Sequence, residues 1–152
     1  NILREYFEHP AITTDVIVGF PGETEEDFAK TKAFLEQIHF YEMHIFKYSK
    51  REGTKAAVMP DQVPEPIKTK RSAVLLESEQ KMSKEFRDYY LGKEVTALLE
   101  EEFTWNGKKY FTGYTKEYVK VAFAADTDLT NQFVKGILRE ELTKDVYLMV
   151  EF

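Results

Sequence analysis

Residues 13–24, read as TTDVIVGFPGET, decide the fold of the first half of this chain. The β-branched apolar run at residues 15–20 is typical of a parallel strand covered on both faces by helices. Pro21-Gly22 ends that strand. Thr24, with an aspartate three residues later, predicts a capping box and a helix over residues 25–37. In α/β sheets, a turn at the carboxyl end of a strand is where ligands bind.

Composition narrows the class of protein. The chain has 152 residues, 43% of them hydrophobic, which is enough for one ordinary core or two small ones. No apolar run approaches the roughly 20 residues that span a bilayer, and no signal sequence is recognisable, so we expect a cytoplasmic protein without a membrane partner. The net charge of −6 argues against a surface that grips nucleic acid everywhere, although a local basic face remains open.

The chain contains no cysteine, and this has a direct chemical consequence. Disulfides are excluded, and so are zinc or iron-sulfur sites held by thiolates of this chain. The first eight residues have the pattern of an amphipathic helix with no start methionine or cap, so we expect the chain to begin inside an element and to be a fragment.

The remaining pattern predicts an α/β part followed by an all-β part. A second strand is expected over residues 42–48, a loop over 50–60 and a long helix over 65–90, whose apolar stripe includes Ile67, Leu75, Met82, Phe86 and Tyr89. We expect three zones: residues 1–63, a connecting helix at 64–91, and a β-barrel at 92–152.

Several short strands are predicted in the last zone, which favours a small barrel. Asn106-Gly107 is a two-residue hairpin signal, because both positions favour positive φ. The expected strands cover residues 94–100, 103–105, 108–114, 118–124, 133–142 and 146–152.

The turn at residues 19–23 is the first candidate site. Its two glycines allow close backbone approach, and the following helix presents N-terminal amides. A phosphate loop is excluded, because no Lys-Ser/Thr pair follows the glycines and the acidic residues would repel phosphate. Those acids also suit the helix dipole, which is the alternative explanation for most of them. Glu23 alone is placed to face a ligand that carries an amine or hydroxyls.

A second loop, at residues 48–54, should lie at the same end of the sheet. Lys50 and Arg51 are suited to a carboxylate or phosphate, or are simply solvated.

The three histidines show no metal-ligand spacing. His39 fits a helix C-terminus, and His44 shares a strand face with aromatic residues, where core packing is the alternative to a site.

Tyrosines alternate with lysines in the barrel zone. Tyr118 and Lys120 are expected opposite a buried face, and Lys108, Tyr110 and Tyr114 opposite Phe111. Such a face can stack RNA bases and contact phosphates, while an ordinary amphipathic barrel wall is the alternative.

Several stretches of this sequence resemble a known family. The stretches ITTDVIVGFPGETEEDF, HIFKYSKREGTKAA and QVPEPIKTKR, followed by GKEV and GYTKEYVKV, are similar to the C-terminal half of the radical S-adenosylmethionine methylthiotransferases. HPAITTDVIVGFPGE and GYTxxY most resemble the branch that acts on threonylcarbamoyladenosine beside the tRNA anticodon. Branches that act on isopentenyladenosine or on a ribosomal-protein aspartate share most motifs. A stand-alone binding module is a further alternative.

The resemblance implies that the first zone is the C-terminal part of a TIM-type radical barrel and the last a five-stranded, OB-like TRAM domain. It implies S-adenosylmethionine (SAM) and two iron-sulfur clusters in a full-length parent, with cluster cysteines that this chain lacks. The fragment alone should then bind neither cofactor and be inactive, and we expect no catalytic or metal-ligating residue in it.

Site residues follow from the same resemblance. Compared with the radical-enzyme pattern GxIxGxxE, Asp15 replaces the first glycine and Gly22 stands where the glutamate would be. The positions expected to contact the cofactor are Ile17, Gly19, Phe20, Pro21, Gly22, Glu23, Tyr48, Ser49 and Arg51. The positions expected to contact RNA are Lys108, Tyr110, Tyr114, Lys116, Tyr118 and Lys120.

The expected partners are tRNA, through its anticodon region, and the N-terminal remainder of the same chain. An unpaired apolar strand edge at residues 15–20 also predicts self-association of the fragment.

Overall fold

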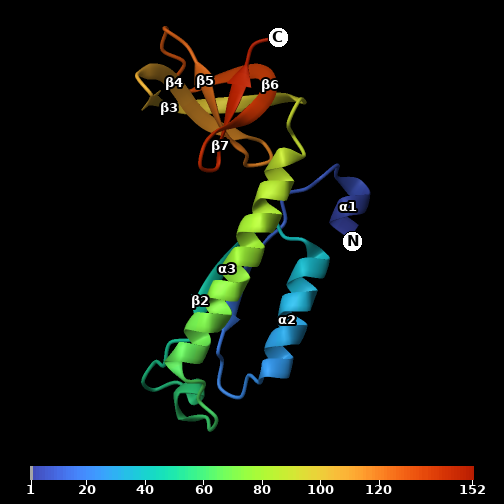
Figure 1. Cartoon of the computed structure of the whole chain (residues 1–152), viewed down its shortest axis with the longest axis vertical. Coiled ribbons are helices and arrows are strands. Elements are labelled where there is room, and N and C mark those ends of the chain that lie inside the picture. Colours follow the sequence, from blue (N-terminus) through green and yellow to red (C-terminus); the bar gives the residue numbers. More distant parts are fainter. Residues whose placement is uncertain (1) are drawn as a thin grey trace. The chain divides into compact units, whose positions relative to one another are not determined.

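A computed structural model describes residues 2–152, which divide into two compact units (Figure 1). One unit is Ala11–Ser83, and the other joins Lys84–Phe152 to residues 2–10. The boundary between the units falls within the long helix α3, Glu65–Asp88. None of the described helices is both long and apolar enough to cross a membrane.

The unit Ala11–Ser83 contains the predicted βαβ arrangement. Strand β1 (Thr13–Val18) is followed by helix α2 (Glu25–Ile38) and strand β2 (Glu42–Lys47), and the two strands pair in parallel from Thr13↔Glu42 to Val18↔Lys47. β1 ends two residues before the predicted end, because Gly19 adopts a φ of +74° that no extended strand accommodates. A short 3-10 helix η1 (Lys55–Val58) lies in the segment predicted as a loop.

One face of this two-stranded sheet is covered and the other is exposed. Val16 and Val18 join a core with side chains from α2 and α3. On the opposite face, Ile17 is 57% exposed, and its register partner Phe46 is 53% exposed. The expectation that β1 is covered on both faces is therefore wrong for the described residues. Helices α2 and α3 contribute to one core cluster, with Val16 and Val18, and leave the face of Ile17 exposed. That core consists of Val16, Val18, Phe28, Leu35, Met43, Leu75 and Met82.

The predicted capping box is confirmed at the start of α2. The Asp27 amide donates to Thr24 Oγ1 at 3.1 Å, and the Thr24 amide donates to Asp27 Oδ2 at 3.1 Å. The predicted place of His39 at the helix C-terminus is confirmed, and this residue caps α2 in the left-handed conformation. The capping box at Thr24 therefore fixes the point at which the turn after β1 ends and α2 begins.

Helix α3 buries a narrower stripe than the sequence predicts. Leu75, Met82 and Phe86 are buried, but Ile67 is 36% exposed; the helix ends at Asp88, and Tyr89, just beyond it, is also 36% exposed. Among the described residues of helix α1 (Ile2–Tyr6), none is buried.

The second unit contains a closed five-stranded barrel with strand order β3-β4-β5-β7-β6. The expected strands at residues 94–100 and 103–105 are one continuous strand, because a bulge between Leu99 and Glu101 absorbs the irregularity. Asn106 and Gly107 form the predicted hairpin, both with positive φ. The strands are β3 (Glu94–Trp105), β4 (Lys108–Thr115), β5 (Lys120–Ala124), β6 (Gln132–Thr143) and β7 (Val146–Val150).

Candidate functional site

The turn after β1 is closed by its own glutamate. The Gly19 amide donates to Glu23 Oε2 at 3.0 Å, and the Glu23 amide donates to the Phe20 carbonyl at 2.9 Å. Gly22, with a φ of +87°, donates its amide to the Asp61 carbonyl at 2.9 Å. Pro21 is buried in the turn. The Glu23 carboxylate is thus occupied by groups of the chain and does not face a ligand as an unengaged acid.

A buried arginine, which the sequence reasoning missed, completes this turn. Arg71 is 4% exposed and donates from Nη1 to Glu23 Oε1 at 2.6 Å and to the Glu23 carbonyl at 3.1 Å. Its Nη2 donates to Glu25 Oε1 at 2.8 Å. The available signal was its position four residues before Leu75, which places both side chains on one face of α3.

The loop after β2 lies beside the turn after β1, as predicted. The rings of Phe20 and Tyr48 meet edge to face with centroids 5.3 Å apart, and the Tyr48 amide donates to the Val18 carbonyl at 2.8 Å. Lys68 donates to the Tyr48 carbonyl at 2.9 Å. Ser49 and Arg51 are exposed. Two strand ends therefore present one continuous surface.

This part of the unit exposes apolar side chains and open backbone. Ile17 and Phe20 expose apolar side chains, Phe20 to 44%. At Gly22 an added Cβ would meet nothing within 4 Å, so the backbone there is open to a ligand. The Tyr48 hydroxyl is buried and has no hydrogen-bond partner among the described residues. An exposed aromatic ring beside open backbone is suited to contact with a flat heteroaromatic ligand.

In the barrel, two of the predicted tyrosines lie together on the surface. Tyr114 is 41% exposed and Tyr118 is 68% exposed, with ring centroids 6.3 Å apart. Lys120 Nζ lies 5.7 Å from the Tyr114 ring centroid, and the Lys116 side chain is 88% exposed. These four residues form an aromatic and basic cluster, hereafter the tyrosine-lysine cluster.

Tyr110 is not part of that surface. It is only 6% exposed, because the strand register places Phe103 directly opposite it on β3 and its strand lies between two others in the closed barrel. The expectation that Tyr110 shares an exposed face with Tyr114 is corrected accordingly. Lys108 is exposed, with its Nζ 5.6 Å from the Tyr110 ring centroid.

A groove of about 900 Å³ in the same unit is lined by three residues of the tyrosine-lysine cluster, Tyr114, Lys116 and Tyr118. Phe133, which the sequence reasoning missed, lines it and is 76% exposed. Lys93 also lines it, with Nζ 3.0 Å from the Tyr89 ring centroid. The lining includes both signs of charge, with Glu8, Glu94, Glu100 and Glu117 opposing Lys93 and Lys116.

The end of α3 is tied to the barrel by a buried tyrosine. Tyr147 donates to Asp88 Oδ1 at 2.6 Å, and Lys84 donates to the same carboxylate at 2.8 Å. Burial alone would raise the pKa of Asp88, but these hydrogen bonds outweigh it and lower the pKa below its ordinary value. Burial, with the bond to Asp88, raises the pKa of Tyr147 to about 12.

Comparison with known proteins gives relatives of named activity, although no family model matches the chain. It is 48% identical over 132 residues to a tRNA-2-methylthio-N(6)-dimethylallyladenosine synthase of Acetivibrio thermocellus, covering 87% of this chain and 27% of the relative. It is 41% identical over 136 residues to the threonylcarbamoyladenosine tRNA methylthiotransferase MtaB of Bacillus subtilis, covering 89% and 30%. It is 37% identical over 158 residues to the ribosomal protein uS12 methylthiotransferase RimO of Clostridium kluyveri, covering 95% and 35%.

These matches extend over most of the chain. The chain therefore belongs to the radical SAM methylthiotransferase family. It spans between 27% and 35% of the length of these three relatives. Its similarity covers members named for tRNA substrates and a member named for a ribosomal protein alike.

Proposed function

We propose that this chain is the C-terminal part of a cytoplasmic tRNA methylthiotransferase, which inserts a methylthio group into a modified adenosine next to the anticodon. The observation that carries this proposal is the identity of 48% and 41% to two proteins named for that class of reaction. In this proposal, Ala11–Ser83 is the last part of a TIM-type barrel and the five-stranded barrel is a TRAM domain.

The first unit would contribute one wall of the cofactor site. When bound in the parent, SAM and iron-sulfur clusters supply the radical chemistry. Ile17 and Phe20 would contact the adenine ring, and the open backbone at Gly22 would allow close approach of the cofactor. Tyr48, Ser49 and Arg51 would approach the cofactor from the neighbouring loop. Because the chain has no cysteine to hold a cluster, the isolated chain should be inactive.

The barrel would bind tRNA through the tyrosine-lysine cluster. Tyr114 and Tyr118 expose rings on which unpaired bases can stack, an interaction of about 1–3 kcal/mol per base. Lys116 and Lys120 are placed to contact phosphates, and Lys108 extends the basic surface along β4. Acidic residues line the same groove as the cluster, so RNA binding there would depend on base stacking and on local phosphate contacts.

The proposed nucleoside is threonylcarbamoyladenosine, on the basis of the motifs around residues 9–23 and 113–118. Dimethylallyladenosine is the second candidate, because relatives named for it reach 48% identity. The test is reconstitution of the full-length parent with SAM and tRNAs that carry one or the other nucleoside, followed by nucleoside mass spectrometry. Methylthiolation of neither tRNA, with modification of ribosomal protein uS12 instead, would favour the ribosomal-protein alternative.

A further inference from the structure

We propose that Arg71 is a positioning residue that holds the turn at residues 19–23 through Glu23 and thereby sets the affinity of the parent protein for SAM. This inference rests on the proposed function, because it assigns a supporting residue to the proposed cofactor wall.

A continuous chain of short contacts leads from Arg71 to the cofactor-facing backbone. The guanidinium reaches the Glu23 carboxylate at 2.6 Å and the Glu23 carbonyl at 3.1 Å. The other oxygen of that carboxylate accepts the Gly19 amide at 3.0 Å. Arg71 therefore fixes Glu23, and Glu23 fixes the residue that precedes Phe20.

Burial makes this arrangement dependent on an arginine. Arg71 is 4% exposed, and the Glu23 side chain is 15% exposed. Removing one partner of a buried ion pair leaves the other charge uncompensated, which is more costly than the pair itself is stabilising. A lysine at this position has a single donor nitrogen and cannot reproduce the planar arrangement in which Nη1 donates to Glu23 while Nη2 donates to Glu25.

The guanidinium itself has little freedom to move. Its Cζ lies 5.5 Å from the centroid of the buried Phe28 ring, and Nη2 donates to Glu25 at 2.8 Å. The Nε atom of Arg71 is buried and has no hydrogen-bond partner among the described residues. The two terminal nitrogens of Arg71, Nη1 and Nη2, make the contacts with the two glutamates. A group fixed on three sides can act as a template for the turn.

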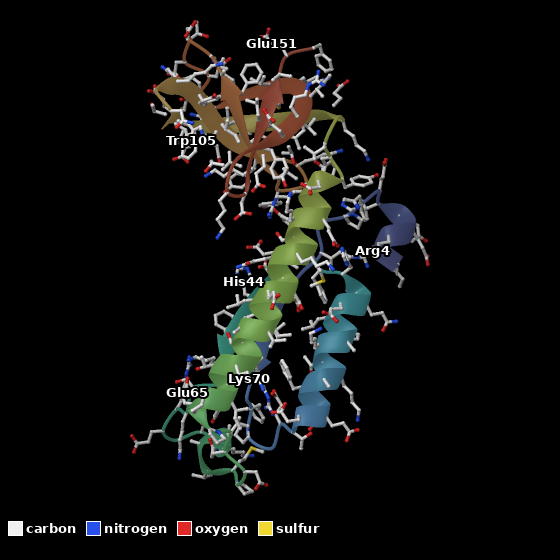
Figure 2. All side chains as sticks on the ribbon, in the orientation of Figure 1. Arg4, His44, Glu65, Lys70, Trp105 and Glu151 are labelled. Carbon is white, nitrogen blue, oxygen red and sulfur yellow. The ribbon has the colours of Figure 1, made fainter. Side chains whose placement is uncertain are left out.

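Lys68, one helical turn earlier on α3, supports the same surface. A Cβ added to Gly19 would lie 2.2 Å from Lys68 Cγ, so the lysine stem packs directly against the turn. Its Nζ donates to the Tyr48 carbonyl in the second loop at 2.9 Å. The first turns of α3, where Figure 2 labels Glu65 and Lys70, thus support both strand ends of the proposed cofactor surface.

The consequence for function is preorganisation. A turn already held in its binding conformation loses less entropy when a ligand binds, so weakening the turn raises the dissociation constant. Arg71 does not touch the proposed cofactor, so the rate constant at saturating SAM should change little. A variant that weakens SAM binding but keeps the rate constant at saturating SAM has lost this positioning role, whereas a variant with a damaged fold would lose both.

The experiment uses the full-length parent with its clusters and measures binding of S-adenosylhomocysteine by calorimetry, together with KM for SAM and kcat. Arg71→Met should raise the dissociation constant and KM at least tenfold, with kcat changed less than twofold. Arg71→Lys should rescue only part of the loss. Amide hydrogen exchange at Gly19 and Glu23 should accelerate in both variants, which gives a readout that does not depend on activity.

Arg87→Met is the matched control. Arg87 is also a buried arginine of α3, 7% exposed, and pairs with Asp145 at 2.6 Å in the other unit. This variant should leave the dissociation constant of S-adenosylhomocysteine within twofold of the wild-type value. A double variant, Arg71→Met with Glu23→Gln, should bind no more weakly than Arg71→Met alone, because both substitutions interrupt the same chain of contacts.

The outcomes separate this inference from the proposed function. A wild-type parent that binds neither SAM nor its homocysteine analogue would overturn both. A wild-type parent that binds, with Arg71→Met equal to wild type or no worse than Arg87→Met, would overturn the inference alone. Full additivity of the two substitutions would show that Arg71 does not act through Glu23.

Discussion

Gly113 in β4 is the position where a single methyl group should be least tolerated. A Cβ built there would lie 1.7 Å from the Leu98 carbonyl oxygen and 2.7 Å from Leu99 Cα, both of them backbone atoms of β3. Gly113 pairs with Leu99, immediately beside the bulge, and Leu99 is fully buried. The close approach of the two strands therefore depends on the absence of a side chain.

The magnitude of the effect follows from this geometry. Carbon–oxygen contacts between strands are ordinarily about 3.3 Å, so Gly113→Ala must separate the backbones by roughly 1.6 Å. Hydrogen bonds of the neighbouring pairs then exceed their limit of about 3.5 Å, at about 1 kcal/mol each. With about 1–3 kcal/mol for overpacking, the free energy of unfolding should fall by roughly 3–5 kcal/mol. That is a large part of the roughly 5–15 kcal/mol that stabilises a typical domain.

Urea unfolding of the 152-residue chain would measure this loss. The single tryptophan, Trp105, lies at the end of β3 and reports on the barrel (Figure 2). Gly107→Ala is the control, because its φ of +75° strains an alanine by roughly 1–2 kcal/mol while nothing lies within 4 Å of the new Cβ. A loss at Gly113 no larger than the loss at Gly107 would refute the reasoning.

Three further predictions follow from the barrel and the sheet. Replacing both Tyr118 and Lys120 by alanine in the full-length parent should weaken tRNA binding at least tenfold and flatten its salt dependence, measured by filter binding; unchanged affinity across the salt series would remove both residues from the RNA surface. The lowered pKa of Asp88 means that its contribution to stability is present above its ordinary pKa of 3.8 and is lost as the pH falls through the lower folded value. Asp88→Asn should therefore reduce the acid dependence of the urea midpoint, and an unaltered acid profile would contradict this role of Asp88. Conversely, the contribution of neutral Tyr147 to stability is present below its ordinary pKa of 10.0 and is lost as the pH rises toward about 12. Because β1 pairs only with β2 within the described residues, the isolated chain should self-associate with rising concentration in light scattering, whereas a monodisperse monomer throughout would contradict this.

Features encoded by neighbouring residues could be predicted from the sequence. The capping box at Thr24 and the hairpin at Asn106-Gly107 depend on residues within four positions of each other, and the structure has both. The parallel pairing of β1 and β2 followed from the order of strand, helix and strand.

Features that depend on distant residues could not be predicted. Arg71 and Glu23 are 48 positions apart, and the position of Arg71 on the same helix face as Leu75 does not identify its partner. Tyr110 alternates correctly for an exposed face, but its burial results from the register that places Phe103 opposite it. The exposed face of β1 was missed for a related reason, because an apolar strand sequence does not reveal which of its faces the chain's own helices cover.

Mass spectrometry of tRNA nucleosides from a strain that lacks the gene for the full-length protein tests the central claim most directly. We expect the loss of one methylthio nucleoside, the methylthio derivative of threonylcarbamoyladenosine, with accumulation of its unmodified precursor. Complementation with the wild-type gene should restore that nucleoside. Retention of every methylthio nucleoside in the deletion strain would contradict the account.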